Sequence, residues 1–185
     1  MLSVTPTALP DVKIITPVRH GDQRGFFSET WNRQAMREAG VDADFVQDNH
    51  SLSGPVGTVR GLHFQSAPFA QDKLVRVSRG RILDVAVDLR RSSLTYGQHV
   101  AVELSAENWR QLWVPVGFAH GFCTLEPDTE VQYKVTAPYS AANDHAVLWN
   151  DPDIGVDWPV SGAEALLSPK DLKQPRLADL PSWFD

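Results

Sequence analysis

Residues 59–65 read Val59-Arg60-Gly61-Leu62-His63-Phe64-Gln65, a short run of β-branched and aromatic residues around one glycine. This composition predicts a strand. Strict alternation would place Val59, Gly61, His63 and Gln65 on one face and Arg60, Leu62 and Phe64 on the other. A glycine two residues before a histidine would leave room for a ligand beside the imidazole. The alternative is an ordinary half-buried histidine next to a packing glycine, and this stretch alone leaves both open.

Short strand-like runs separated by turns continue on both sides of this stretch. In residues 81–89, Leu83, Val85, Val87 and Leu89 alternate with Ile82, Asp84, Ala86 and Asp88, which predicts one buried face. The predicted strands are Phe45–Gln47, Val59–Gln65, Lys73–Ser78, Arg81–Leu89, His99–Leu104, Gln111–Val114, Gly121–Leu125 and Glu130–Val135. Many short strands without helical crossovers indicate an antiparallel sandwich or barrel.

The two ends of the chain have a different character. Residues 13–15 predict a strand, residues 20–25 a loop leading into a strand at Phe26-Phe27, and residues 32–39 a helix ended by Gly40. Short helical pieces are expected near 162–167 and 169–172. No internal repeat or linker interrupts the chain. We therefore expect one domain over residues 1–185, with a barrel core at about 45–135, flanking N-terminal strands and helix, and a C-terminal helical segment.

Composition narrows the class of protein. The 185 residues carry a net charge of -6, and the sequence pI is about 5.4, which argues against a nucleic-acid partner. A single cysteine, Cys123, excludes an internal disulfide framework and suits a reducing cytoplasm. The N-terminal residues lack the pattern of a signal peptide, and no apolar run approaches a membrane span. The expectation is a cytoplasmic protein without a membrane partner.

A second histidine lies in Pro115-Val116-Gly117-Phe118-Ala119-His120-Gly121-Phe122, which reads as a turn delivering His120 to the start of a strand. The spacing PxGxxH resembles the second motif of cupin barrels, in which this histidine often binds a metal. A metal cupin also requires His-x-His and a glutamate, whereas this chain has His63 followed by Gln65. The ligand count therefore disfavours a metal site, and His120 could equally be a polar contact in the barrel mouth.

Two further polar side chains are expected to point inward. Tyr133 shares a strand face with apolar Val131 and Val135, so its hydroxyl needs a partner, which a ligand or a backbone group would provide. Lys73 shares a face with Val75, where it could stabilise a developing oxyanion or reach from the strand end into water.

Charged residues near the candidate loops allow two interpretations each. Ser168-Pro169-Lys170-Asp171 has the form of a helix N-cap, in which Asp171 is a capping carboxylate. Alternatively, Asp171 orients and charges a histidine. Arg24, Arg60 and Lys170 are suited to a diphosphate, although each could be a solvated surface charge.

Taken together, these segments resemble the nucleotide-sugar epimerases typified by dTDP-4-dehydrorhamnose 3,5-epimerase. The resemblance covers about residues 12–175 in order and at nearly uniform spacing. It is carried by residues 24–29, 47–51, 60–65, 71–77, 84–90, 104–108, 115–122, 133–134, 150–152 and 168–171. The resemblance implies a mainly β fold, a cupin-type antiparallel jelly-roll barrel with a few short helices. It also implies a homodimer that works without a cofactor or metal.

The resemblance also implies roles for particular residues. A sugar with a C4 ketone has acidic protons at C3 and C5, and the family inverts these centres through an enolate. The matching base is His63 paired with Asp171, the matching acid is Tyr133, and Lys73 stabilises the enolate. The residues matching the substrate-binding motifs are Arg24, Phe26, Glu29, Gln47, Asp48, Asn49, Arg60, His120 and Lys170. Tyr139 matches a tyrosine that stacks on thymine.

The chain departs from the family pattern at two places. Asp144 stands where the family has a longer glutamate that contacts substrate. The loop Ser53-Gly54-Pro55-Val56-Gly57 is one residue longer than the corresponding loop of the family. The extra residue could shift Gln47 and Asn49 slightly.

The main hypothesis from the sequence is epimerisation of dTDP-4-dehydro-6-deoxy-D-glucose at C3 and C5. One alternative is an epimerase of a single centre, C3 or C5, in secondary-metabolite biosynthesis. Another is a catalytically silent nucleotide-sugar-binding cupin, although binding alone does not require an acid and a base. A metal-dependent cupin enzyme is the third.

Overall fold

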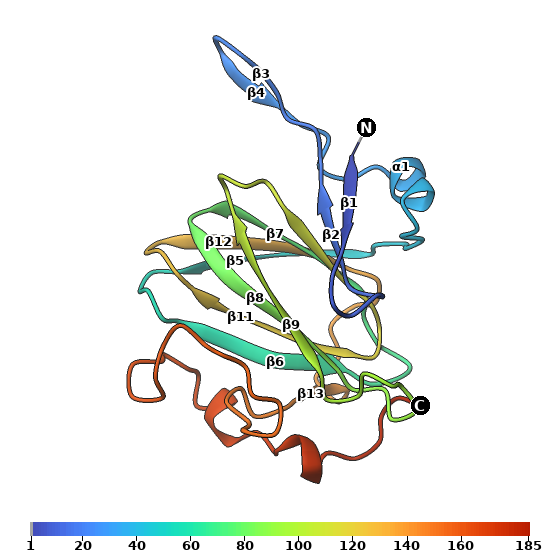
Figure 1. Cartoon of the computed structure of the whole chain (residues 1–185), viewed down its shortest axis with the longest axis vertical. Helices are drawn as coiled ribbons and strands as arrows, with labels where there is room; N and C mark the ends of the chain where they lie inside the picture. Colours follow the sequence, from blue (N-terminus) through green and yellow to red (C-terminus); the bar gives the residue numbers. More distant parts are fainter. Residues whose placement is uncertain (1) are drawn as a thin grey trace.

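Two antiparallel β-sheets face each other in the computed structural model, which describes residues 2–185 (Figure 1). The six-stranded sheet has the order β1-β2-β10-β7-β12-β5, and the five-stranded sheet has the order β13-β6-β11-β8-β9. The strands of the first sheet are β1 Ser3–Pro6, β2 Lys13–Thr16, β10 Gln111–Val114, β7 Lys73–Arg79, β12 Thr129–Val135 and β5 Gln47–Ser53. Those of the second are β13 Asp144–Ala146, β6 Val59–Gln65, β11 Phe118–Thr124, β8 Arg81–Asp88 and β9 His99–Ser105. The prediction of an antiparallel, mainly β fold is confirmed.

The main core lies between the two sheets, where apolar side chains from both inner faces meet. The buried members of this cluster are Leu9, Val12, Val75, Val77, Ile82, Ala86, Val100, Val102, Leu104, Leu112, Val114, Phe118, Phe122 and Val131. Burial of this apolar surface is the main force that holds the sheets together. The core occupies part of the space between the sheets, and the polar cavity described below occupies another.

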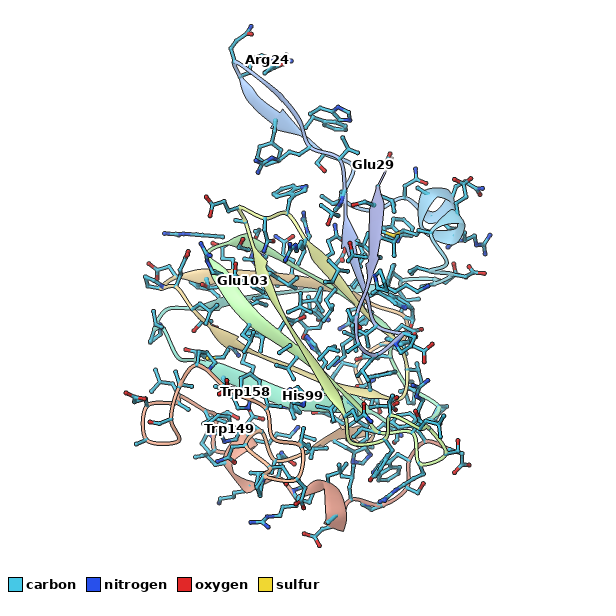
Figure 2. All side chains as sticks on the ribbon, viewed as in Figure 1. Arg24, Glu29, His99, Glu103, Trp149 and Trp158 are labelled. Atoms are coloured by element: carbon cyan, nitrogen blue, oxygen red, sulfur yellow. The ribbon has the colours of Figure 1, made fainter. Side chains whose placement is uncertain are left out.

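Strand β8 is buried on both faces, so the prediction of one buried face is wrong. Ile82 and Ala86 point into the core between the sheets, while Val85 and Val87 pack against the C-terminal part of the chain. Residues 147–185 cross the outer face of the five-stranded sheet (Figure 1) and bury Trp149, Ile154, Trp158, Leu177 and Leu180 against it. Figure 2 labels Trp149 and Trp158 in this layer, where the Trp158 indole N–H donates to the Trp149 carbonyl at 2.7 Å.

The predicted helix is confirmed as α1, Arg33–Glu38, with Asn32 as its N-cap. The Asn32 side chain accepts a hydrogen bond from the Ala35 N–H at 3.1 Å, which satisfies one of the free donors of the first turn. Gly40 follows with φ 76°, the left-handed conformation that favours glycine after a helix. Met36 is the buried residue of α1, and it packs against the outer face of the six-stranded sheet.

Several predicted boundaries differ from the structure. Residues 20–25 were expected to form a loop, but β3, His20–Asp22, pairs there with β4, Gly25–Phe27. The strand predicted at 45–47 is displaced, because β5 runs over 47–53, and β11 begins at Phe118 rather than at Gly121. Strands β1 and β13 were not predicted.

The C-terminal segment contains less helix than the sequence indicates. The helix expected near 162–167 is absent from the structure of this segment, where Ser161 and Glu164 close a turn. Leu166 then extends along β6, its N–H bonded to the Gly57 carbonyl and its carbonyl to the Val59 N–H. The piece expected at 169–172 corresponds to the 3-10 turn η1, Asp171–Lys173, and a second turn, η2, spans Leu177–Asp179.

Strand β6 contains a bulge that changes which side chains share a face. His63 pairs with His120 and Arg60 pairs with Phe122, so three steps along β6 face two steps along β11. An extra residue in one strand reverses the alternation beyond it. Arg60, His63 and Gln65 therefore face the cavity between the sheets, whereas Val59, Leu62 and Phe64 belong to the cluster under the C-terminal segment. The strict alternation predicted for residues 59–65 is wrong for this reason.

The close approach of the neighbouring strand β11 explains why residue 61 is a glycine. A Cβ atom at Gly61 would lie 2.5 Å from the Gly121 Cα and 2.9 Å from the His120 carbonyl oxygen, and its φ is 132°. The glycine allows β6 and β11 to approach closely. The expectation that it leaves room for a ligand beside His63 is therefore wrong.

Strands β3 and β4 form a hairpin that projects from the barrel, away from both sheets (Figure 1). We call residues 19–28, which comprise the hairpin and its two stems, the arm. Phe26 and Phe27 are 56% and 71% exposed. Large apolar side chains exposed this far are typical of a surface that binds another molecule.

No helix in residues 2–185 has the length and apolar character needed to cross a membrane.

Candidate active site

A cavity of about 350 Å³ opens between the two sheets. Strands β5, β6, β7, β11 and β12 supply its walls, and the C-terminal residues 168–171 close one side. The predicted site residues that line it are Gln47, Asn49, Arg60, His63, Lys73, His120, Tyr133, Tyr139, Asp144, Lys170 and Asp171. This volume is within the range of small-ligand sites and would hold a sugar ring.

His63 and Asp171 form a hydrogen-bonded pair across 108 residues of sequence. The His63 Nε2 lies 2.6 Å from Asp171 Oδ1, and Asp171 is 3% exposed. Burial alone would raise the pKa of Asp171. The hydrogen bond and charge of His63, with smaller contributions from Ser168 and Lys170, outweigh burial and hold this pKa below its usual value. The carboxylate stays charged beside the imidazole, which leaves Nδ1 of His63 as the nitrogen that can accept a proton.

Ser168-Pro169-Lys170-Asp171 keeps the N-cap at Ser168, but of the two roles considered for the Asp171 carboxylate the structure shows the pairing with a histidine and not the capping role. The Ser168 hydroxyl accepts a hydrogen bond from the Asp171 N–H at 3.1 Å, as an N-cap does. The Asp171 carboxylate points to His63 instead of back to the turn. The Ser168 cap therefore fixes the backbone of Asp171, while the Asp171 carboxylate holds the His63 ring by its hydrogen bond.

Lys73 points into the cavity and is 7% exposed. Its ammonium donates to the His63 carbonyl at 3.2 Å, so it lies beside the strand that carries the histidine. Burial lowers its pKa to about 8, although the carboxylates of Asp144 and Asp84 act in the opposite direction. A buried ammonium of this kind can stabilise a negative oxygen that develops nearby.

Tyr133 lies on β12 between Asn49 of β5 and Val75 of β7 and reaches into the same cavity. Burial raises the pKa of its hydroxyl; Arg60 opposes this shift and Asp144 adds to it. Within residues 2–185 this hydroxyl forms no hydrogen bond. A neutral phenol without a protein partner can donate its proton to a ligand.

His120 forms a second buried pair, with Asp84 of β8. The His120 Nε2 lies 2.7 Å from Asp84 Oδ1, and the other oxygen, Oδ2, is buried without a partner among residues 2–185. We did not single out Asp84 as a site residue. The sequence pattern that indicates its role is its place on the same strand face as Ile82 and Ala86. An aspartate on a buried face predicts a polar partner, because a carboxylate is rarely buried without one.

Asp144 forms hydrogen bonds with two other residues of the cavity rim. Its Oδ2 accepts hydrogen bonds from the Lys170 ammonium at 2.5 Å and from the Tyr139 hydroxyl at 3.3 Å. The hydrogen bond to Asp144 is also the main reason why the pKa of Lys170 is raised. The shorter aspartate thus holds a tyrosine and a lysine in place.

Polar residues of β5 and β6 complete the wall. The Gln47 side-chain amide donates from Nε2 to Asn49 Oδ1 at 2.9 Å, and its side-chain oxygen Oε1 accepts from the Tyr139 N–H at 3.2 Å. The Arg60 guanidinium is held by the Ser53 hydroxyl at 3.2 Å. These contacts orient donors and acceptors toward the cavity.

Four predicted substrate ligands lie elsewhere. Arg24 and Phe26 are on the arm and Glu29 follows it (Figure 2 labels Arg24 and Glu29), and none of the three lines the cavity. Asp48 points to the opposite face of the six-stranded sheet, where it pairs with Lys134 at 2.8 Å. The alternation of β5 explains its position, because Gln47 and Asn49 point inward.

Gln65 has a structural role at the place where a metal cupin has a ligand. Its amide donates to the carbonyls of Phe69 and Pro138, and its oxygen accepts from the Ser140 N–H at 2.8 Å. These bonds fix the loop that carries Tyr139. In the described part of the chain, no three His, Cys, Asp or Glu side chains converge as a metal-binding group.

Comparison with known proteins connects this geometry to a family. The family model for dTDP-4-dehydrorhamnose 3,5-epimerase matches residues 6–179. The chain belongs to the dTDP-4-dehydrorhamnose 3,5-epimerase family. An epimerase of this name from Sinorhizobium fredii is 55% identical over 177 residues, which cover 96% of this chain and 90% of the relative.

Two solved structures, a dTDP-4-dehydrorhamnose 3,5-epimerase and a dTDP-6-deoxy-D-glucose-3,5-epimerase, have the same fold. The enzyme from Bacillus anthracis, with TDP and PPi bound, is 50% identical with a TM-score of 0.92, over 95% of this chain and 99% of the other. The enzyme from Legionella pneumophila, in complex with dTDP-4-keto-L-rhamnose, is 42% identical with a TM-score of 0.93, over 98% and 95%. The predicted cupin-type jelly-roll fold and the resemblance to this family are confirmed.

Proposed function

We propose that this protein converts dTDP-4-dehydro-6-deoxy-D-glucose to dTDP-4-dehydro-L-rhamnose by epimerisation at C3 and C5. The observation that carries the proposal is the convergence of His63, Asp171, Lys73 and Tyr133 on one cavity. These four groups supply a base, its charged partner, a cation for an enolate and a proton donor. The family relatives named above support the choice of substrate.

The chemistry follows from the C4 ketone of the substrate. His63 removes the proton from the carbon next to the ketone, and the electron pair of the broken C–H bond moves onto the ketone oxygen. The resulting enolate oxygen is stabilised by the Lys73 ammonium. Tyr133 then donates its proton to the opposite face of the same carbon, which inverts the centre. Proton exchange with water returns His63 and Tyr133 to their starting states, so the cycle needs no cofactor or metal.

The remaining cavity residues are proposed to bind the rest of the nucleotide sugar. Arg60 and Lys170 are cations suited to the diphosphate, and Gln47, Asn49 and His120 offer hydrogen bonds to the sugar and nucleotide. Tyr139 is 61% exposed at the rim, where its ring can stack on the thymine. Asp144 acts on Tyr139 and Lys170, which it holds in place.

Proton NMR of the substrate in D₂O with the purified protein tests the function directly. Deuterium is expected at both C3 and C5, with formation of the L-rhamno product. Incorporation at one carbon alone would show a single-centre epimerase. Bound ligand without exchange at either carbon would show a nucleotide-sugar-binding protein without catalysis. The assay is run with and without a metal chelator, and an unchanged rate is expected.

Replacing Tyr133 by phenylalanine is expected to separate exchange from inversion. The variant keeps His63 and Lys73, so deuterons still enter from the face of the base, but the opposite face has no donor. We expect epimerisation to fall by about 10²-fold or more, while wash-in with retention of configuration continues. NMR of residual substrate and of product measures the two events separately. Tyr96→Phe is the matched control, and an unchanged inversion rate in Tyr133→Phe would assign the donor to another group.

We further propose that the protein works as a homodimer in which each arm enters the partner's active site. Arg24, Phe26 and Glu29 match substrate-binding motifs, yet none of them lines the cavity of its own chain. Figure 2 shows Arg24 at the tip of the arm and Glu29 at its base. The Arg24 side chain is 83% exposed and pairs with Asp22 at the hairpin tip. A second copy of the chain provides the cavity that these residues would complete.

Mixing two defective variants tests this exchange of arms. Arg24→Ala is expected to raise KM by about 10- to 100-fold through loss of a charged contact, and His63→Ala removes the base. In a mixed dimer, the pocket of the Arg24→Ala chain receives an intact arm from the His63→Ala chain. We expect recovery of about a quarter of the wild-type rate at low substrate concentration after unfolding and refolding the two together. Absence of recovery would show that each arm serves its own chain.

A further inference from the structure

The turn between β9 and β10 places a tryptophan in an unusual backbone conformation. Trp109 has a φ of 61°, in the left-handed region that bulky residues rarely adopt. Residues persist in this region when their surroundings fix them there, and such positions are associated with function. Neither the proposed reaction nor the proposed binding residues account for Trp109.

Hydrogen bonds within the turn hold this backbone in place. Asn108 Oδ1 accepts from the Ser105 N–H at 3.0 Å and from the Arg110 N–H at 3.1 Å, and the Ser105 hydroxyl accepts from the Asn108 N–H at 2.9 Å. The Trp109 N–H donates to the Ser105 carbonyl at 3.2 Å. The turn after β9 therefore fixes the position of the indole through hydrogen bonds among residues 105–110, none of which involves the arm.

The indole contacts both stems of the arm. The Phe26 ring meets it edge-on with centroids 4.8 Å apart, and its Nε1–H donates to the Ser28 hydroxyl at 3.0 Å. The Arg19 guanidinium lies 5.5 Å from the indole centroid and 5.2 Å from the Phe26 centroid. Arg19 precedes β3, whereas Phe26 and Ser28 lie in and after β4. One side chain thus joins the beginning and the end of the arm to the barrel.

We propose that Trp109 is a positioning residue that fixes the direction of the arm, so that Arg24 and Glu29 reach the active site of a second copy. The inference rests on the arm exchange proposed above. A two-stranded hairpin is marginally stable by itself in water, so an arm without this anchor would sample many directions. Anchoring it removes part of the ordering that substrate binding would otherwise require.

Trp109→Ala is expected to raise KM for the nucleotide sugar by about tenfold and to leave kcat nearly unchanged, because His63, Lys73 and Tyr133 are untouched. Trp109→Phe keeps a ring against Phe26 and Arg19 and should stay within about threefold of the wild-type KM. Tyr96→Ala is the matched control. This variant removes an aromatic ring whose centroid lies 4.7 Å from the Arg91 guanidinium carbon. Tyr96 precedes the first residue of β9, whereas Trp109 follows the last. We expect no change of KM in this control.

A double-mutant cycle separates positioning from general destabilisation. If Trp109 acts by directing Arg24 and Glu29, Trp109→Ala should raise KM by a smaller factor when Arg24 is already alanine than it does in the wild type, because only the contribution of Glu29 is left to lose. An equal increase of KM in both backgrounds would overturn the proposal.

Amide hydrogen exchange of residues 20–27 tests the anchor independently of activity. Faster exchange in Trp109→Ala than in the wild type and in Tyr96→Ala is expected, and unchanged exchange would overturn the anchor. A wild-type KM in Arg24→Ala would instead contradict the arm exchange, and hydrogen exchange would still decide whether Trp109 holds the arm.

Discussion

Replacing His63 by alanine is expected to lower kcat for epimerisation by about 10³- to 10⁴-fold and to suppress deuterium exchange at both C3 and C5. The His63 imidazole is held by the buried Asp171 carboxylate at 2.6 Å, which leaves its other ring nitrogen to accept a proton. That carboxylate keeps its charge and therefore stabilises the imidazolium that forms when the substrate carbon loses its proton. Proton NMR in D₂O measures exchange, and calorimetry with TDP should show binding close to that of the wild type.

His63→Ala leaves Asp171 as a buried carboxylate without its partner, which can destabilise the fold. His63→Gln avoids this problem, since its amide can donate to Asp171 but cannot act as a base at neutral pH. His99→Ala is the matched control, because His99 is on β9 (Figure 2) and does not line the cavity. Retained exchange in a folded His63→Gln protein would assign the base to another group.

Lys73→Met is expected to lower the exchange rate at C3 and C5 by about 10²- to 10³-fold, as for loss of a preorganised group that stabilises an oxyanion. The methionine side chain is about as long as that of lysine, so it fills the buried site, but it is apolar and carries no charge. The loss should affect both centres equally, because the same ketone oxygen carries the charge during both inversions. Lys13→Met removes a lysine from β2 of the same sheet, outside the cavity, and should exchange at the wild-type rate.

The pH dependence identifies the same group. Burial lowers the pKa of Lys73 to about 8, so the ammonium is present below this pH and is lost above it. We therefore expect kcat of the wild type to decrease as the pH rises through about 8. Lys73→Met should lack this alkaline limb. Persistence of the limb in Lys73→Met would show that another group titrates there.

The strands that the sequence predicts well are those with apolar faces. Strands β6 and β10 begin and end where the sequence indicates, and β7 and β8 agree within one residue. Strand β5 was misplaced because Gln47, Asn49 and Ser51 line the cavity and its other face is exposed. A strand that serves a polar site loses the hydrophobic pattern by which strands are recognised. The bulge in β6 was equally invisible, since it depends on the partner strand β11.

The site was predictable to the extent that single residues carry chemistry. The family resemblance and the inward faces of the strands indicated His63, Lys73 and Tyr133, and the structure places all three in the cavity. The sequence left two roles open for Asp171, and only the contact with His63 decides between them. The direction of the arm could not be predicted, because it depends on a single turn at Trp109 more than 80 residues away from Ser28.

The layer formed by residues 147–185 has a consequence for biosynthesis. Every strand of both sheets precedes residue 147, so all residues of the sheets emerge from the ribosome before those of this layer. Until then, the apolar face around Val85 and Leu62 is open to water, and the cavity lacks Asp171 and Lys170. At this stage of synthesis the nascent protein therefore exposes an aggregation-prone apolar surface and lacks part of its active site. Residues 147–185 both cover this apolar face and supply Asp171 and Lys170 to the cavity, so one segment removes both defects.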